Sequence, residues 1–131
     1  MLHKLAPALA TAVLIIFPAA AAAKTVSVTA TSNGKTVHLH RGDTLKLTLR
    51  EVKDGGFTWR TLVAPAPAIL RTLSSRYVAP NLPPGAVGGE GQRVNRYRAT
   101  GAGRVHVRLG DYGPSRAAKP AQRFTLTVVV S

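Results

Sequence analysis

Apolar residues recur at every second position through most of this chain, and that period constrains the fold more than any other feature. Leu45, Leu47 and Leu49 alternate with polar neighbours, and the same spacing returns in 104–109 and 124–130. Successive side chains of a β-strand point to opposite faces, so a period of two predicts strands with one buried face. No long amphipathic helical pattern follows the N-terminal segment. We therefore predict an all-β protein.

The expected strands are short and are separated by turn residues. They are 26–30, 37–39, 44–50, 57–59, 93–99, 104–109 and 124–130, whereas 69–78 has a mixed period that fits a strand or a short helical turn. Asn33-Gly34 is a strong hairpin signal. Phe57 and Trp59 share one strand face and are expected in the core. About seven such strands predict an immunoglobulin-like antiparallel β-sandwich.

The N-terminal segment has the pattern of an export signal. Lys4 precedes an apolar stretch, Leu5 to Phe17, and the alanine run 19–23 offers small residues at the cleavage positions. We expect cleavage after Ala23, which leaves 24–131 as a single domain in the periplasm or secreted. An uncleaved membrane anchor is the alternative, but the longer segment from Leu5 to Ala23 contains two prolines and falls short of the roughly 20 apolar residues of a span.

Charge is strongly unbalanced. The sequence has 18 Lys and Arg against 5 Asp and Glu, a net charge of +13. This excess favours acidic partners and nonspecific binding to polyanions. Five arginines are expected on two neighbouring strands, where they would form a basic stripe: Arg93, Arg96, Arg98, Arg104 and Arg108. A solvated strand face is the simpler interpretation, because the charges are spread along the chain and Tyr97 is the only ring among these arginines.

Catalytic chemistry has little support. The chain has no cysteine, and it contains neither a Gly-x-Ser-x-Gly elbow nor a His-Glu-x-x-His motif. His38 and His40 share a strand face and would bind a metal only with a third ligand, whereas His106 lies on a distant strand. Solvent-facing histidines are the simpler interpretation. We predict a protein that is not an enzyme and uses no metal or cofactor.

Three glycine-bearing loops interrupt the strands: Asp54-Gly55-Gly56, 85–91 and 110–114. Glycine lets a loop bend tightly or lie close against a partner, so each loop is either a turn or a contact surface. Tyr112 is flanked by glycines, which favours contact. A rigid scaffold that presents several such loops is typical of a binding module.

The order of these segments resembles the chagasin family, immunoglobulin-like inhibitors of papain-type cysteine peptidases. The matching pieces are Gly42-Asp43-Thr44-Leu45, Gly56-Phe57-Thr58-Trp59, Gly88-Gly89-Glu90, Ala102-Gly103 with Val107 and Leu109, Gly113-Pro114-Ser115, and Arg123-Phe124-Thr125-Leu126. The resemblance covers 24–131. It implies that three loops wedge reversibly and non-covalently into the cleft of a papain-like cysteine peptidase.

Two of the three family loops depart from the pattern. Val52-Lys53-Asp54-Gly55-Gly56 stands where the family has Asn-Pro-Thr-Thr-Gly, and Gly110-Asp111-Tyr112 stands where it has Arg-Pro-Trp. Loss of two such anchors costs about 4 kcal/mol, so we expect weakened or altered specificity. The expected peptidase-binding residues are Asp54, Gly55, Gly56, Gly88, Gly89, Glu90, Gly91, Gly110, Asp111 and Tyr112. A basic binding module for polyanions or envelope components, without inhibitory activity, is the alternative.

Overall fold

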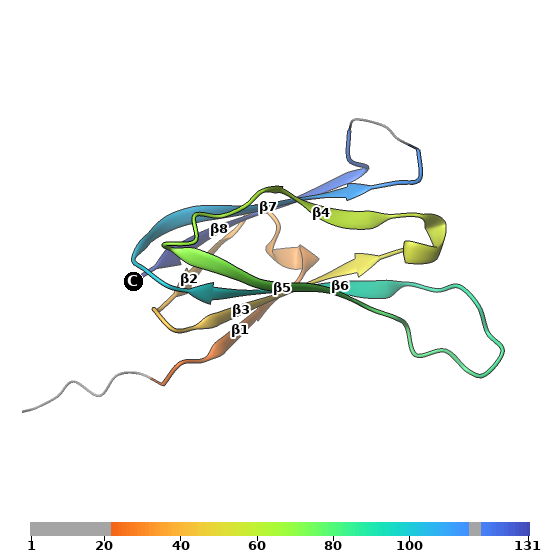
Figure 1. Ribbon diagram of the computed structural model, residues 1–131, viewed down its shortest axis with the longest axis horizontal. Helices are drawn as coiled ribbons and strands as arrows, with labels where there is room; N and C mark the ends of the chain where they lie inside the picture. Colours follow the sequence, from red (N-terminus) through yellow and green to blue (C-terminus); the bar gives the residue numbers. More distant parts are fainter. Residues whose placement is uncertain (1–21, 116–118) are drawn as a thin grey trace, which may run out of the picture.

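Two four-stranded sheets pack face to face in a computed structural model that describes residues 22–115 and 119–131 (Figure 1). Sheet A has the order β1 (Thr25–Val28), β3 (Thr44–Glu51), β6 (Gly91–Ala99) and β5 (Leu70–Val78). Sheet B has the order β2 (Thr36–Leu39), β8 (Gln122–Val130), β7 (Gly103–Tyr112) and β4 (Thr58–Val63). The predicted all-β sandwich is confirmed. Nearly all of the expected export signal lies outside the described residues, in which no helix is long and apolar enough to cross a membrane.

The strand whose period was ambiguous is β5. It pairs with β6 along its length, but the register shifts between Thr72 and Ser74. An irregularity of this kind adds a residue to one strand and reverses its alternation between inside and outside. The mixed period of 69–78 therefore reflects a bulged strand. With β5 included the sandwich has eight strands instead of about seven.

The hairpin expected at Asn33-Gly34 is wrong, because β1 and β2 belong to different sheets. The connection between them contains a 3₁₀ turn, η1 (Ala30–Ser32), and the two residues after this turn bond to β8. The Oδ1 atom of Asn33 accepts a hydrogen bond from the Thr125 backbone N–H at 2.9 Å, and the Gly34 N–H donates to the Thr125 carbonyl at 2.7 Å. In consequence β1 pairs with β3, and β2 with β8, in parallel; the other pairs are antiparallel.

The same division into sheets corrects the predicted basic stripe. β6 lies in sheet A and β7 in sheet B, so their arginines cannot share one surface. Arg93 also points inward, toward buried Glu51, and is not on an outer face. Arg96 and Arg98 therefore lie on a surface separate from that of Arg104 and Arg108.

The core consists of the inward positions of both sheets. Its buried apolar residues are Val28, Leu39, Leu45, Leu47, Leu49, Trp59, Leu70, Tyr97, Ala99, Val105, Val107, Leu109, Phe124, Leu126, Val128 and Val130. Burial of each large aliphatic side chain contributes about 1.5–3 kcal/mol. Trp59 is in the core as predicted. Phe57 is only half-buried and lies beside Gly113, outside the core.

Three connections meet at one end of the sandwich: β3–β4, β5–β6 and β7–β8. Figure 1 shows them on the right, whereas the C-terminus and the β4–β5 and β6–β7 connections lie on the left. We call the three-loop end the loop end, with a first loop at 52–57, a second at 79–90 and a third at 113–121, of which 116–118 are outside the described residues. The strand directions therefore bring together segments that are distant in sequence.

Candidate functional site: the loop end

The first loop is held in shape by one glycine. After the 3₁₀ turn η2 (Lys53–Gly55), Gly56 has φ of +82°, and its N–H donates to the Lys53 carbonyl at 2.8 Å. Side chains other than glycine are strained in that conformation. A Cβ atom at Gly56 would also lie 2.8 Å from the Cβ of Pro114, in the third loop. Gly56 therefore allows both the turn and the close contact of two loops. Asp54 and Gly55 are exposed in the same turn.

The third loop begins later than predicted. Gly110, Asp111 and Tyr112 are the last residues of β7, so their expected position in an exposed loop is wrong. β7 is flanked by β4 and β8, and its pairing with both continues through Asp111. Gly110 and Asp111 are consequently buried, and the loop starts at Gly113. Tyr112 is half-buried on the outer face of sheet B, with its ring 5.7 Å from the guanidinium of Arg60.

The second loop carries the expected glycines and one apolar residue that the sequence analysis did not single out. Gly88 and Gly89 have φ of +84° and +99°, so the chain turns tightly there. Val87 immediately precedes them and is 95% exposed. Glu90 pairs with Arg50. A valine beside two glycines in a β-sandwich loop is the sequence signal that would have identified Val87.

Gly91 is not part of the second loop. It is the first residue of β6, it is buried, and the Tyr77 ring covers the position where its side chain would be. A larger residue at this position would collide with that ring. Gly91 therefore has a packing role at the base of the loop, and its predicted place in the exposed binding surface is wrong.

The first loop lies between the other two. On one side Gly56 and Phe57 touch Pro114 and Gly113 of the third loop. On the other side a hollow of about 400 Å³ separates the first loop from the second. It is lined by Lys53, Asp54, Tyr77, Ala79, Pro80, Leu82, Ala86, Val87 and Gly88. The Lys53 Nζ atom lies 4.7 Å from the centre of the Tyr77 ring at its base. The three loops thus form one continuous surface.

A buried ionic network supports this surface from below. Glu51, fully buried at the end of β3, accepts hydrogen bonds from the Trp59 backbone N–H at 2.7 Å and from Arg93 Nη2 at 2.8 Å. The Trp59 indole N–H donates to the Arg50 carbonyl at 2.8 Å. Trp59 follows the first loop and Arg93 follows the second, so one carboxylate joins the stems of both. Sequence reasoning missed Glu51, although it continues the inward series of Leu45, Leu47 and Leu49.

Asp111 adds a second carboxylate to this region. It is only 7% exposed, and its Oδ1 atom has no hydrogen-bond partner within the described part of the chain. Burial, and then the nearby charge of Glu51, raise the pKa of Asp111 above its ordinary value. Its backbone carbonyl accepts from the Ala121 N–H at 2.8 Å and thereby closes the third loop. The side chain of Asp111 therefore lies beneath the loops and not at their tips.

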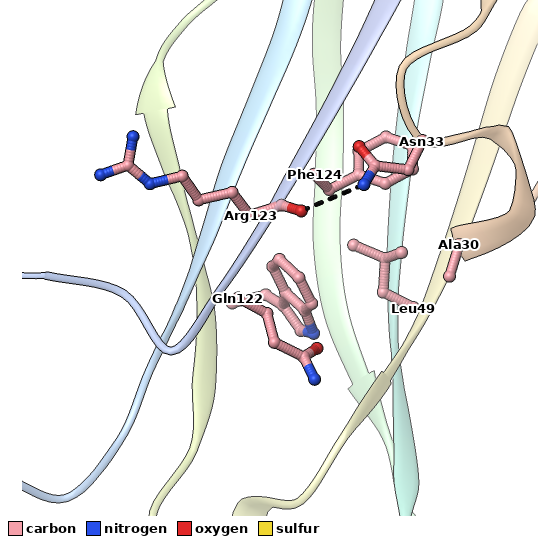
Figure 2. Close-up of a pocket in the computed structure, with 7 residues that line it drawn as sticks. Ala30, Asn33, Leu49, Gln122, Arg123 and Phe124 are labelled. Atoms are coloured by element: carbon pink, nitrogen blue, oxygen red, sulfur yellow. Dashed lines mark hydrogen bonds between the residues drawn. The ribbon is translucent and has the colours of Figure 1, made fainter.

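A second hollow opens at the side of the sandwich and has a different chemistry. It measures about 340 Å³ and is lined by Ala30, Asn33, Leu49, Trp59, Gln122, Arg123 and Phe124. In Figure 2 the Arg123 guanidinium extends away from Leu49 and Phe124, and the Asn33 amide donates to the Arg123 carbonyl at 3.5 Å. Apart from Arg123, its lining residues are apolar or carry an amide, and none has a carboxylate or an imidazole. This hollow is a gap at the edge of the core.

Two of the histidines weighed as possible metal ligands lie within hydrogen-bond distance of hydroxyl groups. His40 Nδ1 lies 3.0 Å from the Ser131 hydroxyl, and His106 Nδ1 lies 3.1 Å from the Thr127 hydroxyl. Within residues 22–115 and 119–131, no group of three or more His, Asp or Glu side chains is placed to hold a metal ion.

A stiff sandwich with three loops gathered at one end is typical of a binding module of the immunoglobulin-like class. A family model described as chagasin family peptidase inhibitor matches residues 38–129. The chain belongs to the chagasin family of peptidase inhibitors. It is therefore grouped with inhibitors of peptidases and not with enzymes. A comparison with curated protein sequences finds no match.

Solved structures share the fold at low sequence identity. The cysteine protease inhibitor EhICP2 from Entamoeba histolytica is 21% identical, with a TM-score of 0.72 over 84% of this chain and 98% of that chain. Amebosin is 24% identical, with a TM-score of 0.65 over 83% of this chain and 98% of its own. PbICP-C, solved in complex with falcipain-2, is 17% identical, with a TM-score of 0.53 over 82% and 92% of the two chains. These likenesses support the immunoglobulin-like architecture.

Proposed function

We propose that this protein is an exported inhibitor of papain-like cysteine peptidases, which binds reversibly and non-covalently by inserting its loop end into the active-site cleft. The observation that carries the proposal is the direct contact of the first loop with the third, through Gly56 and Pro114, beside the hollow that it shares with the second. The family, and the complex of the related fold PbICP-C with falcipain-2, support a cysteine peptidase as the partner.

The loop end would act as a wedge whose central element is the first loop. Gly55 and Gly56 allow the backbone of that loop to lie close to the floor of a cleft. Val87 would insert into an apolar pocket, since a valine with 95% of its surface exposed gains free energy only when a partner covers it. The contacts proposed for Gly55, Gly56 and Val87 are main-chain and apolar, and they need no covalent bond with the peptidase.

The charges of the first loop would set the specificity. Lys53 and Asp54 occupy this loop where the family motif has neutral residues, and Asp54 is exposed. Charged groups at an interface select against partners with like charge and cost free energy when they are desolvated without a counter-charge. We expect the strongest inhibition of peptidases whose clefts carry complementary charges.

The test is a titration of the purified domain, residues 24–131, against papain and several related peptidases with differently charged clefts. We expect competitive inhibition that is lost on dilution, with no mass change of either protein. Absence of inhibition of every enzyme at tens of micromolar would reject the proposal. Heat-inactivated protein, and the Val87→Ser variant described below, are the controls.

Export is tested separately with the full-length chain. We expect the protein to be recovered outside the cytoplasm with Lys24 as its first residue, because the alanine run ends at Ala23. Recovery of the intact N-terminus in the cytoplasmic fraction contradicts export and leaves the inhibition assay unaffected.

A further inference from the structure

The acidic residues are confined to the ends and the interior of the sandwich. Asp43 is buried at the end opposite the loops, where it accepts backbone hydrogen bonds from Lys24 and His40. The others are the buried Glu51 and Asp111 and the loop residues Asp54 and Glu90. These are all 5 acids of the chain, and only Glu90 reaches an outer face, where it pairs with Arg50 at the loop end of β3; the other cations on the outer faces of the sheets have no acidic partner among the described residues.

Five cations cluster on the outer face of sheet A, and we call this surface the basic face: Lys46, Arg71, Arg76, Arg96 and Arg98. Lys46 on β3 is directly opposite Arg96 on β6, and Arg98 on β6 is directly opposite Arg71 on β5. Like charges placed directly opposite one another destabilise a sheet by roughly 0.2–1 kcal/mol per pair. An anionic partner lying along these strands would relieve that repulsion.

A shallow groove crosses the basic face. It measures about 270 Å³ and is lined by Lys46, Arg76, Val78, Gln92, Val94 and Arg96. The valines provide an apolar floor, the Gln92 amide offers both a donor and an acceptor, and the cations stand around them. A sugar ring presents the matching chemistry, because it has apolar faces, hydroxyl groups and, in acidic sugars, a carboxylate or sulfate.

Two other anionic partners fit this face less well. Tyr77 and Tyr97, the rings of β5 and β6, point inward, so the basic face offers no stacking platform to nucleic-acid bases within the described strands. A lipid bilayer presents a plane, whereas the cations surround a groove. The groove therefore favours an extended chain of sugars.

We propose that the basic face binds an acidic polysaccharide. The carboxylate or sulfate groups of the polysaccharide would pair with the cations, and one sugar ring would lie in the groove. The cations are Lys46, Arg71, Arg96 and Arg98. The basic face covers the broad side of sheet A, whereas the loop end lies at the tip of the sandwich (Figure 1). A peptidase at the loop end and a polysaccharide on the basic face occupy different surfaces. The inhibitor would thereby be retained on an acidic glycan, and this role does not depend on the inhibitory activity.

The outer face of sheet B provides a matched control. It carries Arg104, Arg108 and Arg123, which are opposite Val129, Thr125 and Gly110 on the neighbouring strand. These arginines are exposed, as are Arg71 and Arg98, but none is opposite another cation on that strand pair. Replacing three arginines by glutamine on either face removes the same charge. Any difference between the two variants therefore reports the arrangement of the cations and not the net charge.

The experiment measures heparin binding of wild type, R71Q/R96Q/R98Q and R104Q/R108Q/R123Q by calorimetry in moderate salt, with chemically desulfated heparin as the weak-binding probe. We expect binding to fall at least about tenfold in the sheet A variant and less than about threefold in the sheet B variant. Near-ultraviolet circular dichroism checks the fold of each, and the single variants Arg96→Gln and Arg98→Gln replace the triple variant if it does not fold.

Three outcomes overturn the proposal. Equal losses in the two variants would show that only net charge matters. Absence of heparin binding by the wild type would remove the site altogether. Tighter binding of the wild type to single-stranded oligo-dT, or to phosphatidylglycerol vesicles, would assign the basic face to a different class of partner.

Discussion

The carboxylate of Glu51 lies 2.8 Å from Nη2 of Arg93, and both groups are enclosed beneath the loop end. Glu51 is the last residue of β3, just before the first loop, and Arg93 lies near the start of β6, just after the second. The same carboxylate accepts the Trp59 backbone N–H, which follows the first loop. The buried ion pair therefore links the stems of the first and second loops.

Removal of the Arg93 guanidinium should destabilise the whole domain. In Arg93→Gln the Glu51 carboxylate stays buried without its counter-charge, and breaking a buried pair in this way costs about 3–5 kcal/mol. The free energy of unfolding from urea titration checks this value. Arg98→Gln, an exposed arginine on the same strand, is the control and should change stability by no more than about 0.5 kcal/mol. Equal effects of the two substitutions would contradict the structural role of the pair.

The pKa of Asp111 predicts how stability varies with pH. Burial and the Glu51 charge raise this pKa above the ordinary 3.8, so the folded protein holds the proton more tightly than the unfolded chain does. The stability that the proton provides is complete below pH 3.8 and is lost as the pH rises through the raised pKa. Asp111→Asn does not ionise. Its free energy of unfolding should therefore fall less than that of wild type between about pH 4 and about pH 7. Parallel pH profiles would show that Asp111 is solvated.

Gly34 and Gly56 have similar backbone conformations, so substitutions at these two positions distinguish the cost of backbone strain from the cost of a lost loop contact. Gly56 and Gly34 have φ of +82° and +78°, but an added Cβ meets Pro114 only at Gly56, and at Gly34 nothing lies within 4 Å. Gly34→Ala should cost about 1 kcal/mol from strain alone. Gly56→Ala should cost about 2 kcal/mol or more and also weaken inhibition, because the first and third loops are pushed apart. Thermal unfolding and inhibition constants measure the two effects; equal losses at both positions would deny the loop contact.

Val87 should contribute binding energy without contributing stability. Val87→Ser is expected to raise the inhibition constant about tenfold, since it removes an apolar anchor, and to leave the melting temperature unchanged. Val63→Ser is the matched control: Val63 is also exposed, at 61%, but it ends β4 away from the loop end. A lower melting temperature in Val87→Ser, or equal inhibition by both variants, would remove Val87 from the proposed interface.

The fold class could be predicted from the sequence because burial of one face of a strand produces an alternation of apolar and polar residues along the chain. Leu45, Leu47 and Leu49 alternate in the sequence and are all buried in the structure. The same alternation places Trp59 on the inward face of its strand, and Trp59 is in the core. A bulge between Thr72 and Ser74 interrupts the alternation, so the sequence of this segment is compatible with a strand or with a helical turn.

The loop residues were harder to place, because exposure depends on neighbours that are remote in sequence. Gly110 and Asp111 have the composition of a turn, yet they are buried since β4 and β8 pair with β7 on both sides. Conversely, Val87 has the composition of a core residue but remains exposed, because its loop extends beyond the sheets. Neither outcome is visible in a local pattern.

The sequence by itself determined the period of the strands, the inward leucines, the excess of positive charge and the glycines at which the chain turns. Each of these depends on a residue and its nearest neighbours along the chain. Only the tertiary structure decided which strands share a sheet. That pairing separated the arginines of β6 from those of β7, brought Glu51 to Arg93, and gathered three loops at one end. The reason is physical: hydrogen bonding between strands and burial between sheets join residues that are far apart in the chain, and an alternation of period two is compatible with many such pairings.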